Sequence, residues 1–149
     1  LRLVGSEMCI RDRLYCGLSP KFVDVNKEDL TIDFADLEAK ASQSEVLLLS
    51  HMRGHICDME KLLEITNRHG IIVIEDCAHT MGAGWNKKPT GSYGIIGCFS
   101  TQTYKHINSG EGGFLTTNDL TKGMSCKFLT KSSLSGFLYS SVTFAFFNM

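Results

Sequence analysis

The chain has 149 residues, of which 43% are hydrophobic, which is enough for one domain-sized core and too little for two. The 15 basic and 16 acidic residues leave a net charge of −1 without a local Lys/Arg cluster, so we expect neither a nucleic acid nor a membrane as partner. The six cysteines are scattered without a CxxC pair, which favours reduced thiols in a cytoplasmic protein over a metal site or a disulfide framework.

The two ends of the chain differ in character from its centre. Residues 1–18 have no regular period, and the segment VGSEMCIRDR resembles translated adaptor sequence, so we expect an artefact or a disordered leader there. We expect residues 19–120 to form part of one large domain. The tail at 121–149 has no helical or strand period and is consistent with a frameshift, and its apolar part is only about half the length of a membrane-spanning helix.

Ordered structure is predicted to begin near Pro20. The alternating segment Lys21–Asn26 indicates a short strand. A short helix over Leu37–Ala41 follows, with Asp33 near its start. The apolar run Glu45–Ser50 then predicts a buried strand.

The next segment predicts a complete strand–helix–strand crossover. Asp58 can cap a helix that extends from Met59 to His69 with its apolar side chains on one face, and Gly70 can end it. The apolar run Ile71–Glu75 then predicts a strand parallel to the preceding one, joined by a right-handed connection.

Two further strands are predicted after a glycine-rich, turn-forming stretch. They cover Ile95–Ser100 and Phe114–Thr117, with a polar loop between them. Short apolar strands of this kind are typical of a parallel sheet buried on both faces. The pattern therefore predicts an α/β fold, a three-layer sandwich with a mostly parallel sheet.

Polar side chains follow the carboxyl ends of two of these strands. Asp76 and His79 come after the first, and Ser100 and Lys105 come at the end of the second and after it. In open α/β sheets this edge binds ligands. A buried acid, a lysine and a glycine-rich turn at one edge suggest a site for pyridoxal 5'-phosphate (PLP).

Several sequence segments together resemble one enzyme family. They are FVDV, DMEKLLEITNRHG, VIEDCAHTMGA, CFSTQTYKHINSGEGG and FLTTND. In this order and spacing they are similar to the central part of the DegT/DnrJ/EryC1/StrS aminotransferases over about two thirds of the chain. The resemblance implies the aspartate aminotransferase fold (fold type I), PLP as cofactor and transfer of an amino group to nucleotide-linked keto-sugars.

The resemblance also implies a role for each of the four polar residues. Asp76 would pair with the protonated ring nitrogen of PLP, so that the ring can accept electrons. Lys105 would be the catalytic lysine, which binds the cofactor covalently and transfers a proton. Ser100 would bind the cofactor phosphate, and His79 would lie beside the ring.

Each of these residues also has a plainer interpretation. Asp76 could cap the turn that follows it, Lys105 could be a solvated charge, Ser100 could satisfy a strand end, and His79 could be a structural histidine. The segment with His51, Arg53 and His55 follows a strand at the same edge and could also contact cofactor or substrate. No metal site is expected.

The sequence therefore predicts an aminotransferase acting as a homodimer at full length, with an amino donor such as glutamate. The alternatives are another fold-type I PLP enzyme (a lyase, aldolase or dehydratase) and a non-catalytic PLP-binding or regulatory domain. The family's sugar dehydratases carry His at the position of Lys105, so the lysine favours transamination. Tyr104 departs from the small residues that common members of the family have beside this lysine. We expect the chain as given to be inactive, because the resemblance covers only the centre of the family.

Overall fold

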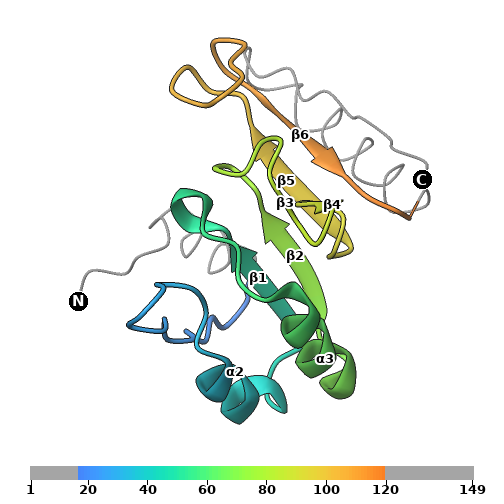
Figure 1. Ribbon diagram of the computed structural model, residues 1–149. Helices are drawn as coiled ribbons and strands as arrows, with labels where there is room; N and C mark the ends of the chain where they lie inside the picture. The colour runs from blue at the N-terminus through green and yellow to red at the C-terminus, as the bar shows by residue number, and fades with distance from the viewer. Residues whose placement is uncertain (1–16, 120–149) are drawn as a thin grey trace.

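The computed structural model describes residues 17–119, which form a mixed sheet with two helices packed against it (Figure 1). The sheet has the strand order β1-β2-β5-β6. Its strands are β1 (Val46–Ser50), β2 (Ile72–Asp76), β5 (Ile96–Ser100) and β6 (Gly113–Thr116). The helices are α2 (Phe34–Ala41) and α3 (Met59–His69), and a separate small ribbon joins β3 (Gly84–Trp85) to β4 (Lys88–Pro89). The expected leader at 1–18 lies almost entirely outside these residues, as does the tail at 121–149.

Parallel pairing brings three strand ends to one edge of the sheet. β1 pairs with β2 in parallel, with Ser50 opposite Asp76, and β2 pairs with β5 in parallel, with Asp76 opposite Cys98. β6 pairs with β5 in the antiparallel direction. The predicted α/β class and mostly parallel sheet are confirmed.

Helix α3 forms where its sequence signals place it. Asp58 accepts hydrogen bonds from the backbone N–H groups of Glu60 and Lys61 at 3.1 and 3.0 Å. Gly70 ends the helix with a positive φ of 68°, a conformation that only glycine adopts without a steric cost. The predicted bounds of this helix are confirmed, because both of its caps are local features of the sequence.

The core lies between the helices and the face of β1 and β2 that carries Leu47, Leu49 and Val73. Alternate strand residues point to this face, as a period of two requires. Two adjoining clusters fill the space. One contains Leu49, Cys57, Met59, Leu62 and Val73, and the other contains Leu37, Ala41, Ile65 and Ile71. Within residues 17–119, no helix is both long and apolar enough to cross a membrane.

The predicted strand at Lys21–Asn26 is wrong. This segment forms only an isolated bridge between Val25 and Ile32. The chain turns back on itself directly after it, because the backbone N–H of Asn26 donates to Thr31 O and that of Leu30 donates to Asn26 O. Val25 is 50% exposed, whereas Val23 packs against the core cluster beside the helices. The apolar alternation that suggested a strand therefore belongs to a segment that turns back on itself.

Candidate functional site

Asp76 lies at the carboxyl end of β2 and keeps its carboxylate half-buried. The hydroxyl of Ser50, its partner on β1, donates to Oδ2 at 3.2 Å, and the backbone N–H of Ala78 donates to Oδ1 at 3.1 Å. Both donors are neutral, and no ion pair to Asp76 forms within residues 17–119. A partly desolvated carboxylate favours a cationic partner, so Asp76 can bind a protonated group at this edge.

His79 follows Asp76 in the turn that leaves β2. Its ring nitrogen Nδ1 accepts a hydrogen bond from the backbone N–H of Arg53 at 3.1 Å. Burial lowers the pKa of the imidazole below its ordinary value, and the charge of Lys105 lowers it further, while Asp76 acts in the opposite direction. His79 therefore lies within electrostatic reach of both Asp76 and Lys105. Three of the four predicted site residues are brought together.

The loop after β5 carries Lys105 and is closed by its own hydrogen bonds. The backbone N–H of Thr101 donates to Gly112 O at 2.9 Å, and the hydroxyl of Thr103 donates to Gly110 O at 2.7 Å. The backbone N–H of Lys105 donates to Gln102 O at 2.9 Å, which forms a tight turn. Lys105 is half-buried and forms no ion pair with any carboxylate in the described part of the chain.

Tyr104 and Ser100, which both precede this lysine in the chain, differ sharply in exposure. Tyr104, which departs from the family pattern, is 92% exposed and points away from the core. Ser100 ends β5 and is half-buried, and its Oγ accepts a long hydrogen bond of 3.4 Å from the backbone N–H of Gln102. Ser100 is thus at the same sheet edge as Asp76. Among residues 17–119 its Oγ acts as an acceptor, so its hydroxyl hydrogen can be donated to a ligand.

Glu75, the neighbour of Asp76, points into the core and is 0% exposed. Its carboxylate accepts four hydrogen bonds. Three come from the backbone N–H groups of Gly91, Tyr93 and Gly94, at 2.8, 2.8 and 2.7 Å. The fourth joins Glu75 to His51 Nε2 at 3.1 Å. Burial alone would raise the pKa of this carboxyl, but the bonds from His51, Gly94 and Gly91 outweigh burial and hold the pKa below its ordinary value.

Glycines allow the turn before β5 to come this close to the sheet. A Cβ added to Gly97 on β5 would lie 2.3 Å from Gly91 Cα, and one added to Gly94 would lie 2.5 Å from Val73 O. Gly91 also has a φ of 79°. The glycine-rich stretch after β2 is therefore required to place three backbone donors around Glu75.

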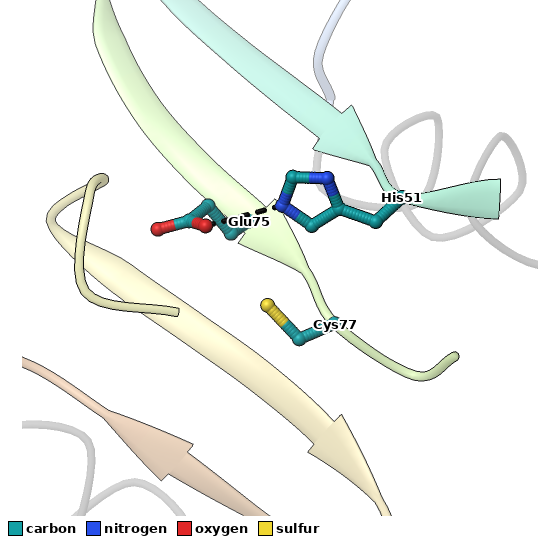
Figure 2. A group of neighbouring side chains, drawn as sticks. All are labelled: His51, Glu75 and Cys77. Atoms are coloured by element: carbon teal, nitrogen blue, oxygen red, sulfur yellow. Dashed lines mark hydrogen bonds and ion pairs between the residues drawn. The ribbon is translucent and has the colours of Figure 1, made fainter. Parts of the chain in front are cut away.

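His51, Glu75 and Cys77 form a buried group whose potential ligand atoms lie within 4.8 Å of one another (Figure 2). Figure 2 shows the His51 ring and the Glu75 carboxylate facing each other from the ends of adjacent strands. Burial raises the pKa of the Cys77 thiol to about 12, so the thiol is protonated. The Glu75 lone pairs are already taken by four donors. The group is therefore a hydrogen-bonded core cluster, unsuited to a cation.

The structure corrects the prediction that His51 could contact cofactor or substrate at this edge. His51 is only 1% exposed and turns inward to Glu75. Arg53 does reach the edge through its backbone N–H, and His55 is exposed. Sequence analysis missed Glu75 and Ser50. An acid inside an apolar strand was the signal for Glu75, because a buried carboxylate needs several donors.

The residues at this edge fit PLP. The cofactor carries a basic ring nitrogen, an aldehyde and a phosphate. Within residues 17–119, Asp76 is a carboxylate without a cationic partner and Lys105 is an amine without an anionic partner. Ser100 offers a hydroxyl group that can donate a hydrogen bond. All of them lie at the carboxyl edge of a parallel sheet.

Comparison with known proteins gives consistent results. A profile of the DegT/DnrJ/EryC1/StrS aminotransferase family matches residues 10–143. GDP-perosamine synthase from Caulobacter vibrioides is 42% identical over 106 residues, which are 70% of this chain and 29% of that protein. The chain thus spans less than a third of the length of the curated relatives it matches.

Solved structures share the fold. An aminotransferase from Psychrobacter cryohalolentis superposes with a TM-score of 0.69 at 33% identity, over 74% of this chain and 28% of that one. An E. coli GDP-4-keto-6-deoxy-D-mannose-3-dehydratase with bound hydrated PLP superposes with a TM-score of 0.68 at 28% identity, over 72% of this chain and 28% of that one.

Proposed function

Because the chain belongs to the DegT/DnrJ/EryC1/StrS aminotransferase family, we propose that the full-length protein carrying it is a PLP-dependent aminotransferase. It would transfer an amino group from an amino acid such as glutamate to a keto-sugar nucleotide. The observation that supports this most is that a carboxylate, Asp76, and an amine, Lys105, both act electrostatically on His79. Neither is neutralised by another charged residue among those described.

Each side chain would have a distinct task. Asp76 would bind and hold the protonated ring nitrogen, and the Ser50 hydroxyl would keep the carboxylate in place. Ser100 would donate its hydroxyl hydrogen to the phosphate. His79 would lie beside the ring. When bound, PLP supplies an electron sink for the carbanion formed next to the substrate nitrogen.

Lys105 would move the proton in this reaction. Its amine would take a proton from the carbon next to the substrate nitrogen and return it at a different position. For this the amine must be unprotonated for part of the cycle, and a lysine bound in a carboxylate ion pair would resist that change. Lys105 has no such partner in residues 17–119, which suits it to the task.

The names of the similar proteins support the substrate class. Two of them name GDP-linked sugars, and one of these, GDP-4-keto-6-deoxy-D-mannose-3-dehydratase, names a keto-sugar nucleotide. We propose a homodimer at full length, supported by the 92% exposed Tyr104 and the 61% exposed Ile107 in the loop of the catalytic lysine. We also propose a cytoplasmic location, because the buried Cys57 and Cys77 are free thiols.

Borohydride trapping tests the proposed role of Lys105. The full-length protein would be incubated with PLP, reduced, digested and searched by mass spectrometry for phosphopyridoxyl peptides. The label is expected on Lys105 and not on the exposed Lys87, and Lys105→Ala should remove it. A label spread over several lysines, or none, would overturn the cofactor site.

A second reaction is favoured by one specific observation, the similarity to a sugar dehydratase of the same fold. Supplying a keto-sugar nucleotide with an amino donor separates the two reactions. A transaminase gives an amino sugar and consumes the donor one for one, whereas a dehydratase gives a deoxy sugar. Lys105, at the position where such dehydratases carry His, favours the first outcome.

A further inference from the structure

Arg53 has a backbone conformation that a non-glycine residue seldom adopts. It lies in a one-turn 3-10 helix (Met52–Gly54) with φ 55° and ψ 21°, in the left-handed region. Such strain persists only where the surroundings hold it, and it often marks a functional position. Its consequence here is specific, because this conformation directs the Arg53 backbone N–H to Nδ1 of His79 at 3.1 Å.

The turn that carries Arg53 is fixed from inside the protein. His51 begins it, and the backbone N–H of Gly54 donates to His51 O at 3.1 Å. The backbone N–H of His51 donates to Asp76 O at 3.1 Å. The His51 ring is held by Glu75, as Figure 2 shows, and Glu75 is itself held by three backbone donors from the turn before β5. His51 therefore cannot turn without breaking a bond to a fully buried carboxylate.

We propose that the buried His51–Glu75 pair positions the Arg53 turn, and that this turn fixes His79 as the tautomer with its proton on Nε2. This proposal rests on the proposed function in one respect only, namely that the site beside His79 binds the cofactor. His51, Glu75 and Arg53 are positioning residues in this proposal, since each acts through His79.

Elementary chemistry of imidazole sets the tautomer. A neutral ring has one protonated nitrogen and one acceptor nitrogen. Nδ1 accepts from Arg53, so it carries no proton, and Nε2 must carry the single one. The ring would then offer the ligand one N–H donor and no positive charge.

The charges around His79 support a neutral ring. Burial, the positive charges of Lys105 and Arg53 and the neighbouring His106 lower its pKa, whereas Asp76 raises it. An imidazolium would also have to place a proton on Nδ1, where the backbone N–H of Arg53 already points. The hydrogen-bond geometry and the local charges thus agree.

Nitrogen NMR of the protein labelled with ¹⁵N-histidine tests the proposal without cofactor. The spectrum distinguishes a protonated from an unprotonated ring nitrogen, and His79→Gln assigns the signals by removing them. We expect wild-type His79 to show a bare Nδ1 and a protonated Nε2, with a pKa below 6.5. A proton on Nδ1 in the wild type would overturn the proposal at once.

Two substitutions at one position isolate the backbone donor. Arg53→Gly keeps the N–H and suits the left-handed conformation, so the wild-type tautomer should persist. Arg53→Pro removes the N–H and cannot adopt a φ of 55°. We expect a mixture of tautomers and a His79 pKa nearer 6.5 in the proline variant, and identical spectra for the two variants would contradict the proposal.

A second pair of variants tests the buried contact. His51→Phe keeps a ring but loses Nε2, and it should change the His79 spectrum as Arg53→Pro does. His69→Phe is the matched control, because His69 also bonds a carboxylate, Glu38 at 2.8 Å, but away from the site. A folded His51→Phe protein with the wild-type His79 spectrum would reduce His51 to a structural role.

The outcome of these NMR experiments is independent of the outcome of the borohydride test of the proposed function. If the protein were not a PLP enzyme, no label would appear on Lys105, while the tautomer of His79 would still be as proposed. If the positioning were wrong, the label would appear and the His79 spectrum would not respond to the variants at Arg53 and His51.

Discussion

At the scale of single residues, the two neighbouring acids of β2 have opposite environments. Successive residues of a strand point to opposite faces, so Glu75 points into the core and Asp76 lies on the other face, at the edge. Glu75 is satisfied by four donors, whereas Asp76 accepts two hydrogen bonds, both from neutral donors, in the described part of the chain. The first acid is therefore structural, and the second is available to a ligand.

Glu75→Gln should destabilise the fold strongly. The amide keeps one oxygen, but its NH₂ group would face backbone N–H groups that now donate to the carboxylate. Each oxygen of Glu75 accepts two of the four hydrogen bonds. Buried donors left unpaired cost about 1–3 kcal/mol each, so we expect the free energy of unfolding in urea to fall by about 2 kcal/mol or more. Glu64→Gln, which changes an exposed acid on α3, should lower it by less than about 0.5 kcal/mol. Equal losses of unfolding free energy in the two variants would contradict the structural role of Glu75.

Stability should fall in two steps as the pH falls. The pKa of His79 is lowered from 6.5, so folding favours the neutral imidazole. The contribution of His79 to the free energy of unfolding is therefore complete above pH 6.5 and is lost as the pH falls below that value. The pKa of Glu75 is lowered from 4.5, so folding favours its carboxylate. Its contribution to the free energy of unfolding is complete above pH 4.5 and is lost as the pH falls further. Urea midpoints measured across this range check both steps. His79→Gln should remove only the upper one, and its persistence in that variant would assign it to another group.

At the scale of elements, local signals could be predicted from the sequence and distant pairings could not. The caps of α3 lie within three residues of its ends, so the prediction of this helix is confirmed. The strand at Lys21–Asn26 failed because a strand needs a partner, and the sequence does not show that this segment bends back instead. Asp76 was found from its place after an apolar run, whereas the partners of Glu75 lie 16 to 24 residues away in the chain.

The cap of α3 gives a prediction at this scale. Asp58→Ala removes the acceptor for the backbone N–H groups of Glu60 and Lys61. Loss of an N-cap of this kind costs about 1 kcal/mol, and the free energy of unfolding in urea should fall by that amount. Glu64→Ala is the control, because it truncates an exposed side chain in the same helix and leaves both caps intact. A loss as large in the control would mean that the cap contributes nothing of its own.

At the scale of the whole molecule, the described part combines a firmly paired centre with a loosely held loop. β2 is paired on both sides, β1 on one side within residues 17–119, and α3 covers the face that carries the core. The loop from Thr101 to Gly112 is held by bonds among its own residues and by the end of β5. Ligand-binding loops are often drawn from such low-stability parts of a fold.

Hydrogen–deuterium exchange should show slower exchange in the paired central strands than in the 101–112 loop, and it should also detect binding of the cofactor. Without PLP, we expect amides of β2 to exchange most slowly, those of β1 faster and those of the 101–112 loop fastest, because exchange requires opening of the hydrogen bonds that protect each amide. On addition of PLP, the loop with Lys105 and the turn with Asp76 and His79 should gain protection, since a ligand bound there must be released before they open. Lys105→Ala should lose most of the gain in the loop. Protection gained over α2 and not at this edge would place the ligand elsewhere and contradict the site.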